Sequence, residues 1–256
     1  MRTVHRTFGP QPSLRECWTY FAQRADQLTG EHREYLLRHC GRLAWISHRA
    51  LQLTRQGDRI LEAGCAWADV ARFLGQCGRA VVGLDDLYCP ERIEGFAFVR
   101  SNLERAPLPF RDASFPCVIF TEVLEHFATS PVPALIELRR VTTPGGVILV
   151  STPNQMSIGH VTRLLANRSN LFQPLESKLS SDWALNRFHN HIYTRHELQL
   201  LFCDHLGLKA RRLRFTNFLP GCGPEHLLRD ILRFGCGLPL PLLRTYLYGE
   251  FQPRTE

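Results

Sequence analysis

Lysine is almost absent from this chain. Lys178 and Lys209 are the only two lysines among 31 basic residues, so the formal charge of +7 comes from arginine. The arginines are scattered, with the nearest approach to a cluster at Arg211, Arg212 and Arg214. A nucleic-acid-binding protein usually concentrates basic residues in a patch with aromatic residues, so no nucleic-acid partner is expected. The charge is interpreted mainly as solvated surface, with an anionic substrate or a membrane headgroup as the less favoured interpretation.

Patterns typical of zinc sites and exported proteins are also missing. The nine cysteines include no C-x-x-C pair, which argues against a structural zinc site and a disulfide framework. Residues 1–12 lack the apolar stretch of a signal peptide, and no run approaches the roughly 20 apolar residues of a membrane span. A cytoplasmic protein with no transmembrane segment is therefore expected.

A nucleotide-type site is predicted where a short apolar strand runs into a glycine turn. Residues 59–62 form this strand, Gly64 ends it, and a helical pattern follows. A second apolar strand at 80–84 leads directly into Asp85 and Asp86. In open parallel sheets the ligand lies beyond the carboxyl ends of the strands. An acid at this place can accept hydrogen bonds from the hydroxyls of a ribose. A nicotinamide enzyme is disfavoured because no G-x-G-x-x-G follows the first strand.

The rest of the chain alternates strands with helices. Capping boxes at Ser13 with Glu16 and at Thr194 with Glu197 predict two helix starts, and a further helical run covers 31–53. The predicted strands lie at 59–62, 80–84, 97–99, 117–121, 147–151, 208–215 and 244–251. This alternation implies right-handed crossovers and an α/β fold with a mainly parallel sheet.

Five motifs follow one another between residues 58 and 208. They are Glu62-Ala-Gly-Cys-Ala-Trp-Ala68, Asp85, Leu108-Pro-Phe110 with Ser114-Phe115, Glu122-Val-Leu-Glu-His126 and Pro144-Gly-Gly-Val-Ile-Leu-Val150. In this order they resemble the motifs of class I S-adenosylmethionine-dependent methyltransferases. The resemblance implies a Rossmann-like, doubly wound, seven-stranded sheet with an antiparallel last strand. We expect an N-terminal helical cap at 1–56 and a methyltransferase core at 57–256.

The resemblance also implies the cofactor, S-adenosylmethionine, and a set of residues that bind it, with no metal. Asp85 would hold the ribose hydroxyls, the loop 62–66 would lie against the methionine portion, and Asn102 with Leu103 would border the adenine. Thr121 and Glu122 would approach the sulfonium. The full predicted cofactor set is Glu62, Gly64, Cys65, Ala66, Asp85, Asp86, Asn102, Leu103, Thr121 and Glu122.

His126 and Glu125 are the candidates for proton chemistry. Histidine titrates near neutral pH, so His126 could take the proton of a hydroxyl during its methylation, with a carboxylate holding the ring. The alternative is that the pair only organises its loop. Four further residues are expected to bind the acceptor, although hydrogen bonds to loop backbone are an equal alternative for the histidines. They are Asn154, His189, His191 and Tyr193.

Three positions depart from the family pattern. Ala66 and Ala68 stand where the family usually has glycine, and Pro116 stands where it commonly has an acid. Trp67 either covers the methionine end of the cofactor or packs beneath the N-terminal helices. The predicted function is methyl transfer to a small-molecule acceptor, and the alternative is a catalytically degenerate methyltransferase fold that serves as a binding or scaffold protein. An RNA methyltransferase is disfavoured.

Two insertions are expected in the core. Residues 153–187 are predicted to form a lid or helices that face the substrate. Residues 216–243 contain an amphipathic helix at 225–234 and an apolar stretch at 238–243. That insertion either packs on the sheet, contacts a second subunit or touches a membrane peripherally. The sequence leaves the oligomeric state and the methyl acceptor open.

Overall fold

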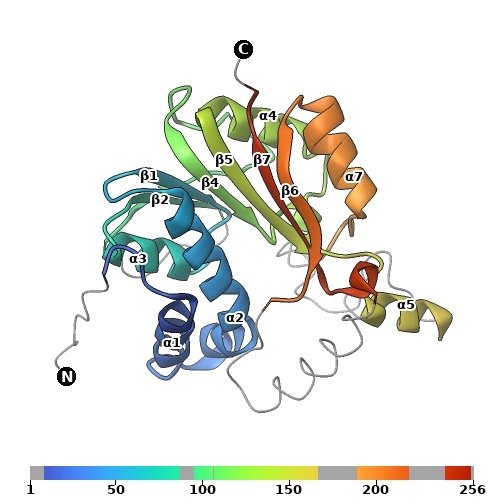
Figure 1. The fold of residues 1–256 in the computed structure, drawn as a ribbon, viewed down its shortest axis with the longest axis horizontal. Coiled ribbons are helices and arrows are strands. Elements are labelled where there is room, and N and C mark those ends of the chain that lie inside the picture. Colours follow the sequence, from blue (N-terminus) through green and yellow to red (C-terminus); the bar gives the residue numbers. More distant parts are fainter. Residues whose placement is uncertain (1–8, 87–94, 106, 167–188, 219–239, 255–256) are drawn as a thin grey trace.

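The computed structural model describes residues 9–86, 95–105, 107–166, 189–218 and 240–254. They form a seven-stranded sheet in the order β3-β2-β1-β4-β5-β7-β6 (Figure 1). The strands are β1 Arg59–Ala63, β2 Ala80–Asp85, β3 Ala97–Arg100, β4 Phe115–Thr121, β5 Thr142–Pro153, β6 Lys209–Thr216 and β7 Tyr246–Gln252. Strands β1 to β5 pair in parallel, whereas β7 runs antiparallel between β5 and β6. The predicted sheet with its antiparallel last strand is confirmed.

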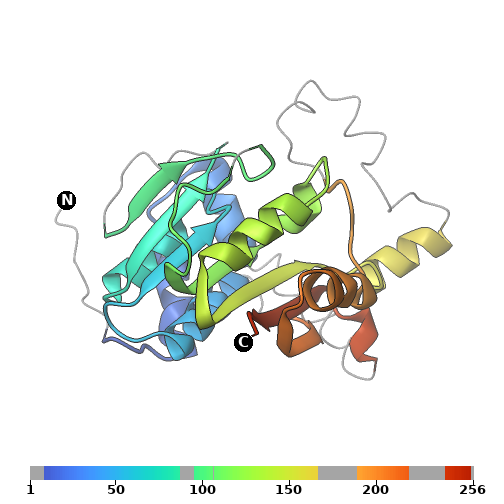
Figure 2. The same ribbon diagram turned by 90° about the horizontal axis from the view of Figure 1, so that it is seen from above.

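Helices lie on both faces of this sheet. They are α1 Leu14–Ala25, α2 Gly30–Leu53, α3 Asp69–Gln76, α4 Val132–Val141, α5 Ile158–Leu165 and α7 Arg195–Gln199. Shorter helical turns are η1 Leu124–His126, the π-helix η3 Leu200–His205 and the 3-10 turn η4 Pro241–Leu243. In Figure 1, α2 crosses in front of the sheet, and α5 projects from the body of the molecule in Figures 1 and 2.

The alternation of strand side chains produces two hydrophobic cores. Ile60 and Ile119 face the core that contains α1, α2 and α3. Their chain neighbours Leu61 and Phe120 face the core of α4 and α7. Successive strand residues point to opposite faces, so strands that are apolar at every position require helices on both sides. The doubly wound architecture follows from that composition.

Local sequence explains where several elements begin. Both predicted capping boxes are present, at the starts of α1 and α7. Pro116 was expected to open the fourth strand, but it is the second residue of β4 and lies where the register between β4 and β5 shifts. A proline cannot donate a ladder hydrogen bond, and such an irregularity is one of the few places where a strand tolerates it.

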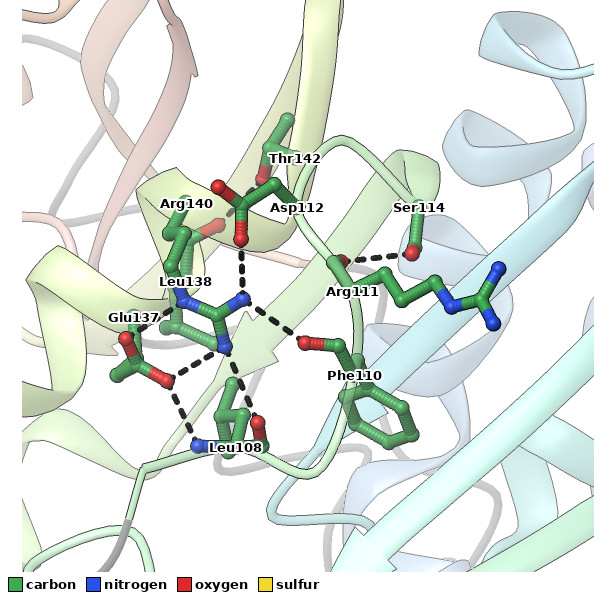
Figure 3. Close-up of polar contacts among 9 residues, drawn as sticks. All are labelled: Leu108, Phe110, Arg111, Asp112, Ser114, Glu137, Leu138, Arg140 and Thr142. Atoms are coloured by element: carbon green, nitrogen blue, oxygen red, sulfur yellow. Dashed lines mark hydrogen bonds and ion pairs between the residues drawn. The ribbon is translucent and has the colours of Figure 1, made fainter.

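Arg140 of α4 fixes the loop that carries the Leu108-Pro-Phe110 motif (Figure 3). Its guanidinium donates to the carbonyl oxygens of Leu108 and Phe110 at 3.1 and 2.8 Å. The same group pairs with Glu137 at 2.7 Å and with Asp112 at 2.6 Å. Glu137 in turn accepts the backbone N–H of Leu108 at 2.7 Å. The motif therefore has a structural explanation: it holds the approach to β4 against α4.

A buried ion pair joins α2 to the antiparallel strand β7. Arg49 donates from Nε and Nη2 to the two carboxylate oxygens of Glu250, at 2.8 and 2.9 Å. The Tyr248 hydroxyl donates to the same carboxylate at 2.9 Å, and Glu250 is fully buried. Burial opposes ionisation, but these bonds outweigh it and hold the pKa of Glu250 below its usual range. Helix α2 is thereby tied to the last strand.

Cysteine chemistry is mostly as expected. Cys17, Cys65, Cys77, Cys117 and Cys203 are free. Cys40 is disulfide-bonded, although the cysteine spacing argued against a disulfide framework. Among the described residues, no helix combines the length and apolar character needed to span a bilayer.

Only part of each predicted insertion lies within the described ranges. The first contributes α5, whereas 167–188 lie outside them. The amphipathic helix predicted at 225–234 and residues 238–239 of the apolar stretch also lie outside the described residues, whereas the rest of that stretch contains η4.

Candidate active site

A cavity of about 640 Å³ opens at the carboxyl ends of β1, β2, β4 and β5. The loops that follow these strands form its floor, while α2 and the start of α5 contribute side chains from other directions. This volume lies within the range of about 300 to 1,000 Å³ that is usual for small-molecule sites. Its place at the strand ends is the position predicted for a ligand in an open parallel sheet.

The turn after β1 contains three residues with positive φ. Gly64 has φ 77°, and a Cβ added there would lie 2.3 Å from Cγ2 of Val123, so only glycine allows this close approach. Ala66 and Ala68 have φ 47° and 57°. The alanines therefore adopt the left-handed conformation that glycine would adopt more readily. The turn adopts positive φ at both alanines, and holding alanine in this conformation costs conformational energy.

Asp85 connects this turn to the end of β2. Its Oδ2 accepts the backbone N–H of Ala66 at 2.8 Å, and the side chain lines the cavity. Asp86 accepts a hydrogen bond from the side-chain amide of Asn102, whose own Oδ1 accepts the backbone N–H of Glu104 at 2.8 Å. These contacts align the loops after β1, β2 and β3 around one end of the cavity.

Trp67 lies between α2 and the cavity. Its indole stacks on His32 with centroids 4.8 Å apart at 10°, and it contacts Tyr35 at 4.9 Å. The side chain also lines the cavity. The Trp67 side chain thus packs against α2, as one interpretation predicted, and also lines the cavity where the other interpretation placed the cofactor.

Two carboxylates, one half-buried and one fully buried, lie on the wall formed by the loop after β4. Glu122 adopts φ 56°, and its Oε1 accepts a hydrogen bond from the Ser151 hydroxyl at 2.7 Å. Glu125 is fully buried; its Oε2 accepts from the Thr152 hydroxyl at 3.0 Å. Its Oε1 is buried without a hydrogen-bond partner among the described residues. Non-glycine residues held in the left-handed region often mark functional sites.

The pKa values of Glu122 and Glu125 are both raised. Burial raises the pKa of Glu122, and the nearby Arg42 guanidinium partly opposes that rise. Burial, followed by the charge of Glu122, raises the pKa of Glu125 well above its usual value. Arg42 itself is buried on α2 and donates to the Tyr35 hydroxyl at 3.0 Å. One guanidinium therefore faces two carboxylates across the cavity.

Two histidine rings complete the same wall. His126 and His189 lie edge to face with centroids 5.0 Å apart. Their loops are joined because Asn190 donates its backbone N–H to the Glu125 carbonyl at 2.7 Å and its side-chain amide to the His126 carbonyl at 2.8 Å. Burial, then the neighbouring histidines His126 and His160, lower the pKa of His189 to about 4. Residues more than 60 positions apart in the chain thus form one polar cluster.

Most of the predicted site residues line this cavity, and five do not. Those on its surface are Gly64, Ala66, Asp85, Asp86, Asn102, Leu103, Thr121, Glu122, Glu125, His126 and His189. Those away from it are Glu62, Cys65, Asn154, His191 and Tyr193.

The residues away from the cavity have other contacts. Glu62 accepts the backbone N–H of Ala71 at 2.8 Å, which holds α3 against β1. The Asn154 amide donates to the carbonyls of Leu242 and Arg244, both at 2.7 Å. Cys65 is almost fully buried beneath the turn.

His191 and Tyr193 lie in the loop before α7. His191 contacts Glu197 at 2.9 Å, and its ring meets that of Tyr193 at 4.5 Å. Tyr193 is buried. Among the described residues, the His191 ring thus contacts a side chain of α7 and not the loop backbone that the alternative named.

Sequence reasoning did not single out the α2 residues that line the cavity, which are Glu31, Tyr35, Arg38, His39 and Arg42. They precede every recognised motif, and a helix pattern identifies which face is buried without identifying what that face covers.

Comparison with known proteins agrees with this geometry. Residues 30–213 match a family described as "Methyltransferase domain". A probable S-adenosylmethionine-dependent methyltransferase of Mycolicibacterium smegmatis is 36% identical over 106 residues, which cover 40% of this chain and 40% of that protein. A malonyl-[acyl-carrier protein] O-methyltransferase of Serratia marcescens is 33% identical over 102 residues, covering 38% of each chain. The chain therefore matches less than half the length of these two relatives.

A solved structure shares the fold at lower identity. It is the 1,6-didemethyltoxoflavin-N1-methyltransferase of Burkholderia thailandensis with bound 1,6-didemethyltoxoflavin and S-adenosylhomocysteine. The TM-score is 0.55 at 13% identity, covering 95% of this chain and 92% of that one. Fold and cavity define a nucleotide-cofactor protein, and the family match is more specific. The chain belongs to the class I S-adenosylmethionine-dependent methyltransferases.

The residues present fit this cofactor. The carboxylate of Asp85 faces the cavity at the position where ribose hydroxyls need an acceptor. The backbone at Gly64 and Ala66 lines the space beside it, with no side chain larger than a methyl group. A carboxylate and a turn of small residues therefore adjoin within one cavity.

Proposed function

We propose that this protein transfers a methyl group from S-adenosylmethionine to an oxygen atom of a small-molecule acceptor. The observation that carries the proposal is the continuity of the cavity. It extends from Asp85 and Asn102, past Thr121 and Glu122, to the cluster around His126. A cofactor and a second molecule can therefore meet in one cavity.

The chain's own contribution is mainly orientation. When bound, S-adenosylmethionine supplies a methyl group that is already electrophilic. The protein needs to hold the acceptor in line with it and exclude competing water, which is catalysis by proximity. Asp85 holds the ribose, and the loops fixed by Asp86 and Asn102 border the base. Glu122 and Thr121 lie between the cofactor end and the acceptor end.

The acceptor end has the character expected for an oxygen nucleophile. His126, His160 and His189 line it together with Arg163, so several side chains there can donate hydrogen bonds to an acceptor oxygen. In this proposal the His126 ring can also take the proton of a hydroxyl acceptor. The relatives include O-methyltransferases for malonyl-[acyl-carrier protein] and for ubiquinone biosynthesis, which favours a carboxyl or hydroxyl oxygen.

The second candidate is a binding protein that has lost catalysis, suggested by Ala66 and Ala68. The geometry disfavours it, because both alanines keep the positive φ that the turn requires. The cavity also retains Asp85 and a polar acceptor end, which a scaffold would not need.

Methyl transfer from S-adenosylmethionine with a labelled methyl group tests the proposal. The panel would contain carboxylates, acyl thioesters with a free carboxylate, and phenols. We expect label in an ester or ether product, with the rate at least about 100-fold lower in Asp85→Ala, a loss of roughly 2.7 kcal/mol. Asp204→Ala removes an exposed carboxylate outside the cavity and should leave the rate unchanged. Cofactor binding without transfer to any acceptor class would instead support the scaffold.

A further inference from the structure

A histidine and carboxylate cluster at the acceptor end has the composition of a metal site. Donor atoms of Glu125, His126 and His189 all lie within 4.8 Å of one another. Within the described part of the chain, these are the side chains of metal-binding type that come together in this way. Glu125 and His126 follow β4 in η1, whereas His189 comes from the segment that precedes α7.

The carboxylate supplies a second, independent observation. Glu125 is 0% exposed, and its Oε1 has no hydrogen-bond partner among the residues that the structure describes. A buried polar atom without a partner destabilises the folded state, and more so when it is charged. A buried polar atom without a partner in a native structure calls for an explanation, and here the same carboxylate has an oxygen within 4.8 Å of a nitrogen of each imidazole.

The charge balance of the wall points the same way. Glu122 and Glu125 both line the cavity, and Arg42 is the cation whose charge acts on both of them. The buried Glu125 and the half-buried Glu122 share one guanidinium, so a negative charge lacks a counter-charge when both carboxylates are ionised. A bound divalent cation would compensate it, and burying charges is tolerated when they are paired or coordinate a metal.

We propose that Glu125, His126 and His189 bind a divalent first-row transition metal at the acceptor end of the cavity. Two imidazoles and one carboxylate suit manganese, iron, cobalt or zinc better than magnesium or calcium, which prefer oxygen ligands alone. Metal–ligand bonds of about 2.1 Å place donor atoms roughly 3 to 4 Å apart, so small side-chain rotations complete the set. Three protein ligands leave positions open toward the cavity, where an acceptor oxygen can bind.

This assignment changes the expectation that no metal takes part, and it gives His126 a different role. A ring nitrogen that binds the ion cannot also accept a proton. The acceptor hydroxyl would then lose its proton to solvent more readily, because coordination to the cation lowers its pKa. The use of the metal in transfer rests on the proposed function, whereas metal binding can be measured without any methyl acceptor.

Equilibrium dialysis and cobalt absorption spectroscopy on tag-free protein test the site directly. We expect one Co²⁺ or Mn²⁺ per chain, and visible Co²⁺ bands that report nitrogen and oxygen ligands. His189→Ala and Glu125→Gln should each weaken binding at least about tenfold. His191→Ala is the matched control, because this histidine is two residues away, outside the cluster, and contacts Glu197 at 2.9 Å. It should leave metal binding unchanged.

Each outcome separates the two proposals. No stoichiometric binding by the wild type, or equal binding by all three variants, would overturn the metal site. Glu125→Gln is nearly isosteric, so it remains informative if His189→Ala fails to fold. S-adenosylhomocysteine binding is measured on the same samples. Metal binding without cofactor binding would leave the site standing and contradict the methyltransferase proposal.

Discussion

Two fully buried glutamates behave in opposite ways in this protein. Glu250 of β7 is bonded at both carboxylate oxygens, by Arg49 and by Tyr248, and its pKa lies below the usual range. Glu125 beside the cavity has one oxygen bonded to Thr152 and one without a partner in the described residues, and burial raises its pKa. The carboxylate of Glu250 therefore stabilises the fold, whereas the carboxylate of Glu125 has an oxygen available for a ligand.

The difference shows how local charge pairing separates structural residues from functional ones. A buried ion pair with satisfied hydrogen bonds serves the fold, and breaking it from one side leaves a charge stranded. A perturbed carboxylate without full pairing, located in a cavity, indicates a functional site. Burial alone would not have distinguished these two glutamates.

Breaking the structural pair should give the largest effect on stability. Glu250→Gln leaves Arg49 largely buried without its counter-charge, so we expect the free energy of unfolding to fall by about 3 kcal/mol. Urea denaturation followed by circular dichroism measures this change. The double variant Arg49→Met with Glu250→Gln should recover part of the loss. A cost below about 1 kcal/mol for Glu250→Gln would show that the pair contributes little.

Acid should weaken the same pair. The folded-state pKa of Glu250 is depressed relative to its unfolded value of about 4.3, so its contribution is present above that pH. The contribution is lost as the pH falls through the lower folded-state value. Thermal melts between pH 7 and pH 3 should show a steeper loss of stability in the wild type than in Glu250→Gln. Parallel profiles would contradict this assignment.

Neutralising the functional carboxylate should have a much smaller effect. Glu125→Gln can still accept the Thr152 hydroxyl bond, and it removes a charge that burial disfavours. We expect the free energy of unfolding to change by no more than about 1 kcal/mol, in either direction. Methyl transfer should nevertheless fall. If Glu125→Gln destabilised the protein as much as Glu250→Gln, the contrast between the two glutamates would fail.

The smallest expected effect concerns the turn after β1. Ala66→Gly removes a methyl group from a residue at φ 47°, and we expect a gain of about 0.5 kcal/mol from relief of the left-handed conformation. Ala71→Gly is the control, because it lies within α3 and should lower stability by about 1 kcal/mol. A destabilising Ala66→Gly would show that the alanine methyl makes a contact the turn needs.

Much of the fold could be predicted because its determinants are local. Strand ends coincide with Gly64 and Asp85, and both capping boxes lie where the sequence places them. The bulge at Pro116 and the π-helix after α7 were not predicted, since both depend on how neighbouring elements pack.

The candidate site was only partly predictable, because its parts meet through tertiary structure. Motif positions identified Asp85 and His126 on the cavity, but no pattern connects Arg42 of α2 to the loop after β4. The pairing of Arg49 with Glu250 spans 201 positions and could not be seen in the sequence. The unpartnered oxygen of Glu125 is likewise visible only in the folded chain.

Calorimetric titration with S-adenosylhomocysteine tests the central claim, that the cavity is a cofactor site, most directly. We predict micromolar binding, about −8 kcal/mol, that Asp85→Ala abolishes and Asp204→Ala preserves. No detectable binding by correctly folded wild-type protein, or binding that survives Asp85→Ala undiminished, would contradict it.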